Sequence, residues 1–236
     1  MLPEGYIGVL DKGYVGLVST MGADIDVANA ARVSYDKKSK LREDGSLTIA
    51  DKRLVNFLWE EGHTSPFRHA TLSFEIYAPL MVARQHWKYA VASTFVDDQN
   101  GWNESSRRYI TENEEFYIPS ENEWRSAPEN SKQGSGDPID IADGAYFTDK
   151  LKQYVHLGTE LYSQALEAGM APEQARLLLP SYGMYVRYRW TTSLHGVMHF
   201  LQQRLAKDSQ VEIQKYAQAI YQLSSASFPN SLELIK

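Results

Sequence analysis

The chain has 236 residues, no cysteine and a formal net charge of −6 at pH 7. Its length suits one large domain or two small ones, and its hydrophobic fraction of 43% is enough for a packed core but too low for a membrane protein. The lack of cysteine excludes disulfides, thiolate metal sites and a cysteine nucleophile, and the acidic charge argues against a general nucleic-acid-binding protein.

The sequence carries no sign of a membrane or secretory destination. Its first residues lack the basic start and apolar core of a signal peptide. No apolar run approaches the ~20 residues that a membrane span needs. We therefore expect a cytoplasmic protein without membrane contact.

The first third of the chain is predicted to alternate short strands and helices. Residues 14–18 are typical of a strand, and Asp24 is a candidate N-cap for the helix that follows. Residues 51–61 are predicted to form a helix with one apolar stripe, which Gly62 ends. Residues 72–76 alternate apolar and polar side chains, which predicts a half-buried strand.

The richest polar chemistry follows that strand. Pro79 can close the strand and open a helix that carries Arg84, Gln85 and Lys88. After a polar loop at residues 97–101, the stretch ends on a second polar cluster, Asn103-Glu104-Ser105-Ser106-Arg107-Arg108-Tyr109. Arginine offers a planar fork for phosphate, serine a neutral donor, and glutamate an acceptor for a base or sugar hydroxyl. The cluster fits an oxyanion site, although charge runs are also common on solvated turns.

The second half of the chain is predicted to be mainly helical. Residues 120–140 are poor in aliphatic side chains, which predicts a long surface loop. A long amphipathic helix follows, ended by Gly169 and marked by Phe147, Leu151, Tyr154, Leu161 and Ala165.

Four further elements complete the chain. Pro172 starts a short helix, and residues 185–190 alternate aromatic and arginine side chains as a strand. Ser193 is predicted to cap one helix, and residues 209–212 fit a capping box for the last. Because composition does not change along the chain, we expect a single α+β domain over residues 1–236.

Several common catalytic patterns are missing or weak. There is no GxSxG, Walker or correctly placed GxGxxG motif. His195 and His199 have the spacing of helical metal ligands, but no glutamate follows the first, so we expect no metal site. Arg176 and Arg204 lie in apolar surroundings, where an arginine either takes an anionic partner or snorkels to the surface.

Taken together, these blocks resemble the flavin-dependent thymidylate synthases. The similarity runs from about residue 9 to residue 229 and includes the blocks Ala30-Ala31-Arg32-Val33-Ser34, Gly62-His63-Thr64-Ser65-Pro66-Phe67, Val82-Ala83-Arg84-Gln85, the 103–109 cluster, Ala175-Arg176-Leu177-Leu178-Leu179-Pro180, and Arg204 followed by Glu212-Ile213. The order of all these blocks together is the specific part of the signal.

The resemblance implies a fold, a reaction and an assembly. The fold would be a mixed or antiparallel sheet with long helices. The reaction would be reductive methylation of dUMP to dTMP, with 5,10-methylenetetrahydrofolate as carbon donor, NADPH as reductant and FAD as cofactor. A chain without cysteine agrees with that chemistry, since no enzyme nucleophile is needed. The assembly would be a homotetramer whose sites are shared between subunits.

The resemblance also assigns the site residues, with Arg204 and Ser106 in the catalytic roles. Arg204 would contact the uracil and favour its ionisation. The dUMP contacts would be Gln85, His86, Trp87, Lys88, Glu104, Ser105, Ser106, Arg107, Arg108, Arg176 and Arg204. The FAD contacts would be His63, Ser65, Lys88, Tyr89, Ala90, Glu104, Ser193, His195 and His199.

One departure from the family pattern is central. The family carries arginine-histidine-arginine where this chain has Lys88-Tyr89-Ala90, and residues 94–102 are inserted before Asn103. We expect the 132–136 loop, and Trp102 free to stack on a flat ring, to replace the missing contacts. Two alternatives stay open: an enzyme that makes another 5-substituted dUMP, and a nucleotide-binding homologue without turnover.

Overall fold

The computed structural model describes residues 2–92, 101–105, 114–129 and 134–235, with the backbone alone for residues 89–92. The described strands form one antiparallel sheet in the order β1-β2-β3-β5-β4. Their bounds are β1 Tyr6–Val9, β2 Gly13–Met21, β3 Thr71–Pro79, β4 Gly101–Glu104 and β5 Tyr185–Ser193. The predicted α+β class is therefore confirmed, with an antiparallel sheet.

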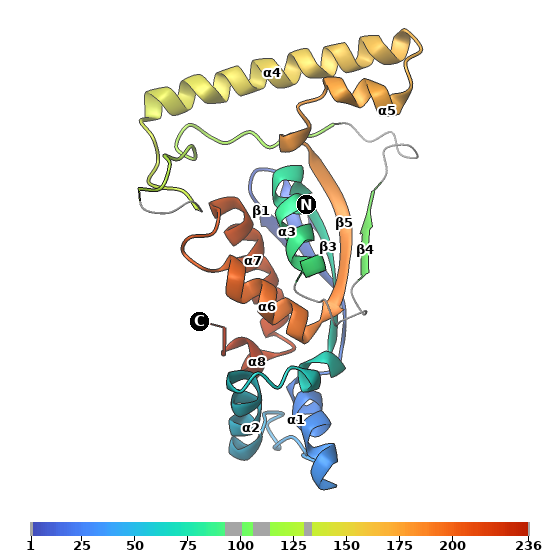
Figure 1. Ribbon diagram of the computed structural model, residues 1–236, viewed down its shortest axis with the longest axis vertical. Helices are drawn as coiled ribbons and strands as arrows, with labels where there is room; N and C mark the ends of the chain where they lie inside the picture. Colours follow the sequence, from blue (N-terminus) through green and yellow to red (C-terminus); the bar gives the residue numbers. More distant parts are fainter. Residues whose placement is uncertain (1, 93–100, 106–113, 130–133, 236) are drawn as a thin grey trace.

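The helices lie mainly on one face of that sheet (Figure 1). Their bounds are α1 Asp24–Arg32, α2 Ile49–Glu60, α3 Leu80–Ala92, α4 Ile141–Glu167, α5 Pro172–Ala175, α6 Leu194–Arg204, α7 Val211–Ser225 and α8 Pro229–Leu232. Short 3₁₀ turns occur at Val33–Tyr35, Ser65–His69, Arg176–Leu178 and Ser181–Gly183. Helices α3, α6 and α7 cover the centre of the sheet, while α1 and α2 lie at one end of the molecule and α4 at the other (Figure 1).

The two central strands supply the core. Leu72, Phe74 and Ile76 alternate along β3 and are fully buried, because every second side chain of a strand points to the same face. Phe74 is paired with Trp190 of β5, and their rings stack 5.7 Å apart. Each such side chain contributes roughly 1.5–3 kcal/mol through burial, so these strands hold the helices that carry the site.

Most predicted helix ends are confirmed. Ser193 caps α6 by accepting a hydrogen bond from the Gly196 N–H at 3.2 Å. Gly62 and Gly169 have φ of 69° and 81°, the left-handed conformation that ends a helix at low cost for glycine. Pro79 is the last residue of β3, and α3 begins immediately after it.

Two predicted caps are wrong, and two strands were missed. Asp24 is the first residue of α1, not its cap; its carboxylate accepts hydrogen bonds from Asn230 and Ser231 instead. The Ser209 hydroxyl donates to the Gln203 carbonyl oxygen and closes the α6–α7 turn, so Gln210 takes the cap position of α7. Strands β1 and β4 are only four residues long, too short for a period to stand out.

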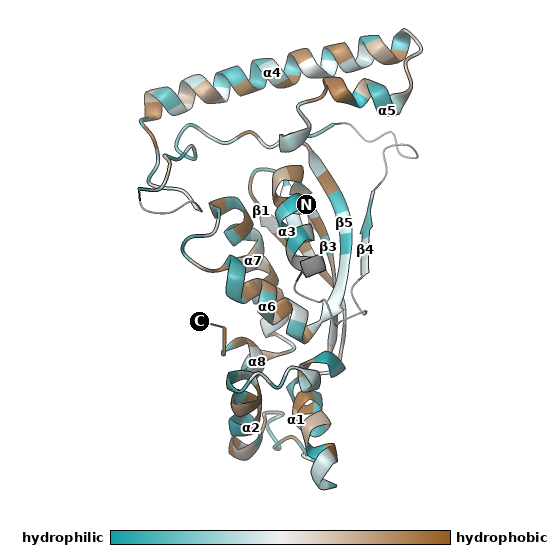
Figure 2. Cartoon of the chain, viewed as in Figure 1, coloured by the Kyte–Doolittle hydropathy of each residue, from teal (hydrophilic) through white to brown (hydrophobic). Residues whose placement is uncertain are grey.

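The long helix α4 exists as predicted, but the chain leaves most of its apolar stripe uncovered. Of the five residues that marked it, only Ala165 is buried, while Phe147, Tyr154 and Leu161 are 47%, 55% and 38% exposed. Figure 2 shows hydrophobic residues recurring along the whole helix, which stands apart from the sheet. No described helix has both the length and the apolarity of a membrane span.

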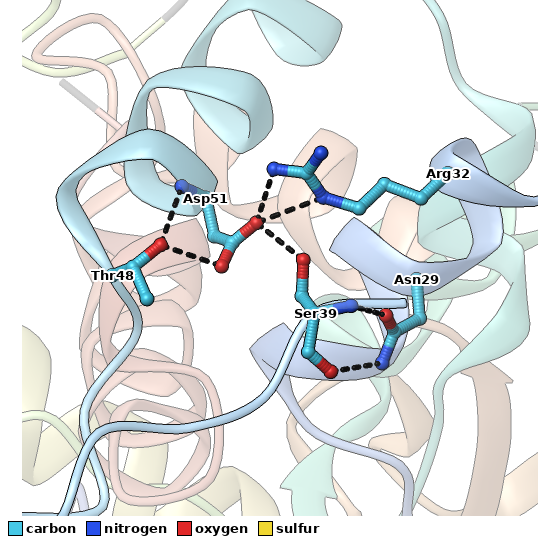
Figure 3. A network of polar contacts seen from close by, with 5 residues as sticks. All are labelled: Asn29, Arg32, Ser39, Thr48 and Asp51. Atoms are coloured by element: carbon cyan, nitrogen blue, oxygen red, sulfur yellow. Dashed lines mark hydrogen bonds and ion pairs between the residues drawn. The ribbon is translucent and has the colours of Figure 1, made fainter. Parts of the chain in front are cut away.

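A closed polar network joins α1 to α2 at the opposite end of the molecule (Figure 3). Asp51 Oδ1 accepts from Arg32 Nη2 at 2.6 Å and from Ser39 Oγ at 2.5 Å. Its Oδ2 accepts from Thr48 Oγ1 at 2.6 Å. Asn29 completes the network by binding the backbone N–H and C=O of Ser39. Burial by itself raises the pKa of Asp51, but these donors outweigh it and hold that pKa below its usual value.

Candidate functional site

A cavity of about 970 Å³ lies between α3, α4, the α6–α7 turn and the segments that precede α4. Its polar lining includes residues from two distant parts of the chain, Gln85 on α3, and Arg204 and Glu212 on either side of the α6–α7 turn. Its apolar side includes Met81, Leu151 and Tyr154. A pocket of this size, apolar with a few converging polar groups, is typical of a small-molecule site.

A chain of amide hydrogen bonds fixes the polar side. Gln85 Nε2 on α3 donates to Gln210 Oε1, and Gln210 Nε2 donates to Glu212 Oε2 at 2.7 Å. Arg204 is the last residue of α6 and turns toward the same cavity. A guanidinium and a carboxylate on one wall can read the donor and acceptor edge of a flat heterocycle.

The residues before α4 form a third wall of the cavity. Residues 120–140 were expected to form a surface loop, and their described parts are held by backbone contacts. Arg125 and Pro138 form an antiparallel bridge, and the Ser126 N–H donates to the Asp137 carbonyl oxygen at 2.9 Å. Glu123 pairs with Lys215 of α7 at 3.0 Å. Of the proposed 132–136 loop, Gly134 and Ser135 line the cavity, whereas Lys132 and Gln133 lie outside the described residues.

A second, smaller cleft of about 260 Å³ opens elsewhere on α3, between Arg84, Trp87, Trp102 and Glu104. Burial raises the pKa of Glu104, and the positive charge of Arg84 partly opposes that shift. Trp102, which was expected to stack on a flat ring, lines this cleft. One face of its ring stacks on Tyr188 at 4.1 Å, because β4 pairs with β5 and places both side chains on the same face of the sheet.

His86 lies in the core and lines neither the cavity nor the smaller cleft. It is 1% exposed, stacks on Phe200 at 4.4 Å and has Nδ1 3.0 Å from the Tyr188 hydroxyl oxygen. Burial lowers its pKa to about 3, so the ring is neutral at ordinary pH. Its position one turn after Val82, which is also buried, was the sequence signal for a core residue.

The other proposed dUMP contacts are spread over the molecule. Lys88 is exposed on α3, and the Ser105 N–H donates to the Arg187 carbonyl at 2.8 Å. Arg176 has Nε and Nη2 buried without a hydrogen-bond partner among the described residues. Ser106, Arg107 and Arg108 lie outside the described residues.

The proposed FAD contacts lie mostly near α2 and the start of α6, away from the large cavity. His63 is exposed and stacks on Phe57 at 5.9 Å, and Ser65 is exposed nearby. The ring of His195 makes an edge-on contact with the ring of Trp59. Burial lowers the pKa of His199. Ser193 Oγ is occupied in capping α6, while the Tyr89 and Ala90 side chains lie outside the description. No cluster of three histidine, aspartate or glutamate side chains able to hold a metal occurs in the described part.

The comparisons with known proteins agree over nearly the whole chain. Residues 16–230 match the family described as thymidylate synthase complementing protein, Thy1. The chain is 36% identical over 230 residues to the flavin-dependent thymidylate synthase of Thermotoga neapolitana, covering 96% of this chain and 92% of that one. It is 37% identical over 224 residues to the enzyme of that name from Thermus thermophilus, covering 94% and 75%.

The solved structures show the same fold. A UMP/dUMP methylase, PolB from Streptomyces cacaoi bound with 5-Br dUMP, superposes with a TM-score of 0.78 at 25% identity, covering 97% of this chain and 96% of that one. The same methylase bound with 5-Br UMP gives 0.76 at 23% identity.

Proposed function

The chain belongs to the Thy1 family of flavin-dependent thymidylate synthases, and from this premise we propose that it methylates dUMP at C5 to give dTMP. The observation that carries the proposal is the cavity in which Arg204, Gln85 and Glu212 face one ligand volume. The relatives at 36% and 37% identity, named for this reaction, support it.

Arg204 supplies the electrostatic part of the proposed chemistry. A fixed guanidinium beside the uracil imide lowers the cost of the N3 anion and of the negative charge that develops on the ring. Gln85 and Glu212, fixed by Gln210, would orient the same ring through its polar edge. The chain has no cysteine to attack C6, so activation of the ring by charge fits its composition.

The atoms and electrons balance with one reductant. Methylenetetrahydrofolate delivers a carbon at the oxidation level of formaldehyde, and NADPH supplies the hydride that turns it into a methyl group. The tetrahydrofolate then leaves unoxidised, and its two nitrogens, freed of the methylene bridge, take up the equivalent of the C5 proton of dUMP and one further proton from solvent. FAD, when bound, supplies the redox chemistry that passes the hydride on.

The candidate FAD residues of one chain fit a single wall of a flavin site. His63, Ser65, His195 and His199 offer exposed or half-buried donors near one end of the molecule, whereas Gln85 and Arg204 face the cavity beneath α4. A complete site therefore needs further walls from other copies of the chain.

We infer that the protein assembles as a homotetramer with shared sites. Two observations support the assembly: the uncovered apolar stripe of α4, and the separation of Glu104 in the small cleft from Arg204 in the large cavity. An apolar helix face of this kind is stabilised when a partner covers it. The partly buried Arg176, unpaired among described residues, agrees with a role toward a nucleotide in a neighbouring subunit.

The test is one assay on purified protein. Protein saturated with FAD is mixed with dUMP, methylenetetrahydrofolate and NADPH, and the product is identified by mass. We expect dTMP, a yellow protein whose flavin spectrum bleaches on reduction, and a tetramer by light scattering. Bound dUMP without turnover would instead identify a non-catalytic homologue and contradict the proposal.

The same assay should also look for a different 5-substituted dUMP, because this chain departs from the family at one set of residues. Lys88-Tyr89-Ala90 replaces the family's arginine-histidine-arginine, which removes a guanidinium fork from the proposed flavin contacts. A mass other than that of dTMP would point to a different 5-substituted dUMP. Running UMP beside dUMP tests the sugar preference in the same experiment.

A further inference from the structure

Two glutamine side chains connect α3 to the start of α7 along the polar lining of the large cavity. Gln85 Nε2 donates to Gln210 Oε1, and Gln210 Nε2 donates to Glu212 Oε2 at 2.7 Å. All three side chains are half-buried and line the cavity. The family resemblance assigned no ligand contact to Gln210, which stands between two residues that face the ligand volume.

The carboxylate of Glu212 sets the direction of both amides. An ionised carboxylate only accepts hydrogen bonds, so Gln210 turns its NH2 end to Glu212 and its carbonyl oxygen to Gln85. That oxygen needs a donor, and the NH2 group of Gln85 provides it. If either amide were reversed, two acceptors would face each other. The direction therefore follows from the chemistry of the three groups.

The consequence at the cavity is that Gln85 keeps its carbonyl oxygen for a ligand. Its Nε2 is bound to Gln210, and no described residue donates to its Oε1. Arg204, the last residue of α6, lines the same cavity, and its guanidinium carries only donors. One ring in the cavity thus meets an acceptor from α3 and donors from α6.

We propose that Gln210 is a positioning residue that makes this cavity prefer a uracil ring to a cytosine ring. The inference rests on the proposed function, because it takes the pyrimidine of the nucleotide to lie beside Gln85 and Arg204. Uracil carries a donor, N3–H, between two carbonyl oxygens, so it can donate to Gln85 Oε1 and accept from Arg204. Cytosine has an unprotonated N3, which would face Gln85 Oε1 as acceptor against acceptor. Gln210 acts through the amide of Gln85.

The experiment measures dUMP and dCMP binding to the full-length protein by calorimetry, together with the Tm of the ligand-free protein. Wild type should bind dUMP at least tenfold more tightly. Gln210→Met keeps the side-chain volume but removes the amide, so Gln85 can turn either end to the ring. We expect the dUMP-to-dCMP affinity ratio to fall by roughly three- to tenfold, the effect of one neutral hydrogen bond. Helix α7 should keep its start, because Gln210 makes no side-chain capping bond.

A second variant and a matched control separate direction from packing. Glu212→Gln puts a group that both donates and accepts at the end of the relay, so the two amides can run in either direction and the ratio should fall again. Gln214→Met is the control: its Nε2 donates to the backbone carbonyl oxygens of Ala206 and Ser209, so it steadies the same turn without orienting a second amide. It should lower the Tm at most and leave the ratio unchanged.

The inference is overturned if Gln210→Met and Glu212→Gln weaken both nucleotides equally or not at all, or if Gln214→Met lowers the ratio as much as they do. Wild-type protein that binds dUMP and dCMP alike would also overturn it and leave the proposed function standing. Wild-type protein that binds neither nucleotide would contradict the proposed function itself, and this inference with it.

Discussion

Buried polar groups in the network at the α1–α2 end of the molecule have hydrogen-bond partners within the chain, whereas one beside the large cavity has none among the described residues. Around Asp51, at the α1–α2 end, each carboxylate oxygen accepts from a donor within residues 32–51 (Figure 3). Around the large cavity, Ser135 Oγ is buried without a partner in the described structure. A polar group paired inside the chain stabilises the fold, whereas a buried one without a partner lowers the free energy of unfolding by roughly 1–3 kcal/mol.

The largest effect on the cavity is expected from Arg204→Lys, which should lower the methylation rate. Lysine keeps the charge but loses the planar fork that meets a pyrimidine edge. We expect the methylation rate to fall by roughly 100-fold, the scale of losing one preorganised donor, while dUMP affinity and ligand-free Tm change little. Single-turnover rates and calorimetry check this; turnover at the wild-type rate would remove Arg204 from the chemistry.

Asp51→Asn disrupts the polar network at the α1–α2 end and should destabilise the fold. The change removes the charge that Arg32 and Ser39 bind, and the arginine is 24% exposed, so we expect a loss of about 2 kcal/mol in the free energy of unfolding. Urea titration measures it. Asp44→Asn, a change at an exposed aspartate whose carboxylate accepts from Ser46, is the control and should leave the midpoint in place. dUMP affinity of folded Asp51→Asn protein should equal that of wild type.

The pH dependence of stability should separate His86, in the core behind the cavity-lining helices, from Asp51 at the α1–α2 end. His86 is neutral when folded, with its pKa lowered by burial from 6.5 to about 3. Unfolding therefore takes up a proton below pH 6.5, and stability should fall by up to about 1.4 kcal/mol per pH unit as the pH drops toward 3. His86→Gln should flatten this window. Asp51, whose folded pKa is also lowered, contributes only below its unfolded pKa of roughly 3.9.

The smallest effect is expected at the Lys215–Glu123 ion pair, which attaches the cavity wall to α7. Both side chains are partly exposed, at 40% and 33%, so Lys215→Met should cost less than about 1 kcal/mol, and less still at high salt. Lys12→Met, which removes a looser pair at 3.9 Å from Glu115, is the comparison. A large destabilisation by Lys215→Met would mean that the excursion is part of the folding core.

The sequence prediction succeeded where the signal was local. The strand at 72–76 and the helix at 51–61 follow from side-chain periods within one element. Arg204 and Gln85 were selected through the family resemblance, and the cavity brings them together. The contacts of His86 and Trp102 were not foreseen because their neighbours, Phe200 and Tyr188, lie 114 and 86 residues away in the chain. The spacing of His86 from Val82 was a local sign of burial, but it does not show which rings the histidine meets.

The sequence by itself determined the α+β class and most helix ends. The order of its short sequence blocks along the chain also indicated the family. Periodicity, glycine and proline act over a few residues, so they can be read without a fold. The tertiary structure decided which polar groups are already paired and which face the cavity. Gln85 meets Gln210 across 125 positions, and Ser135 reaches the cavity because Gly134 packs on Asp208. Such contacts depend on how the helices pack on the sheet, which no short stretch of sequence encodes.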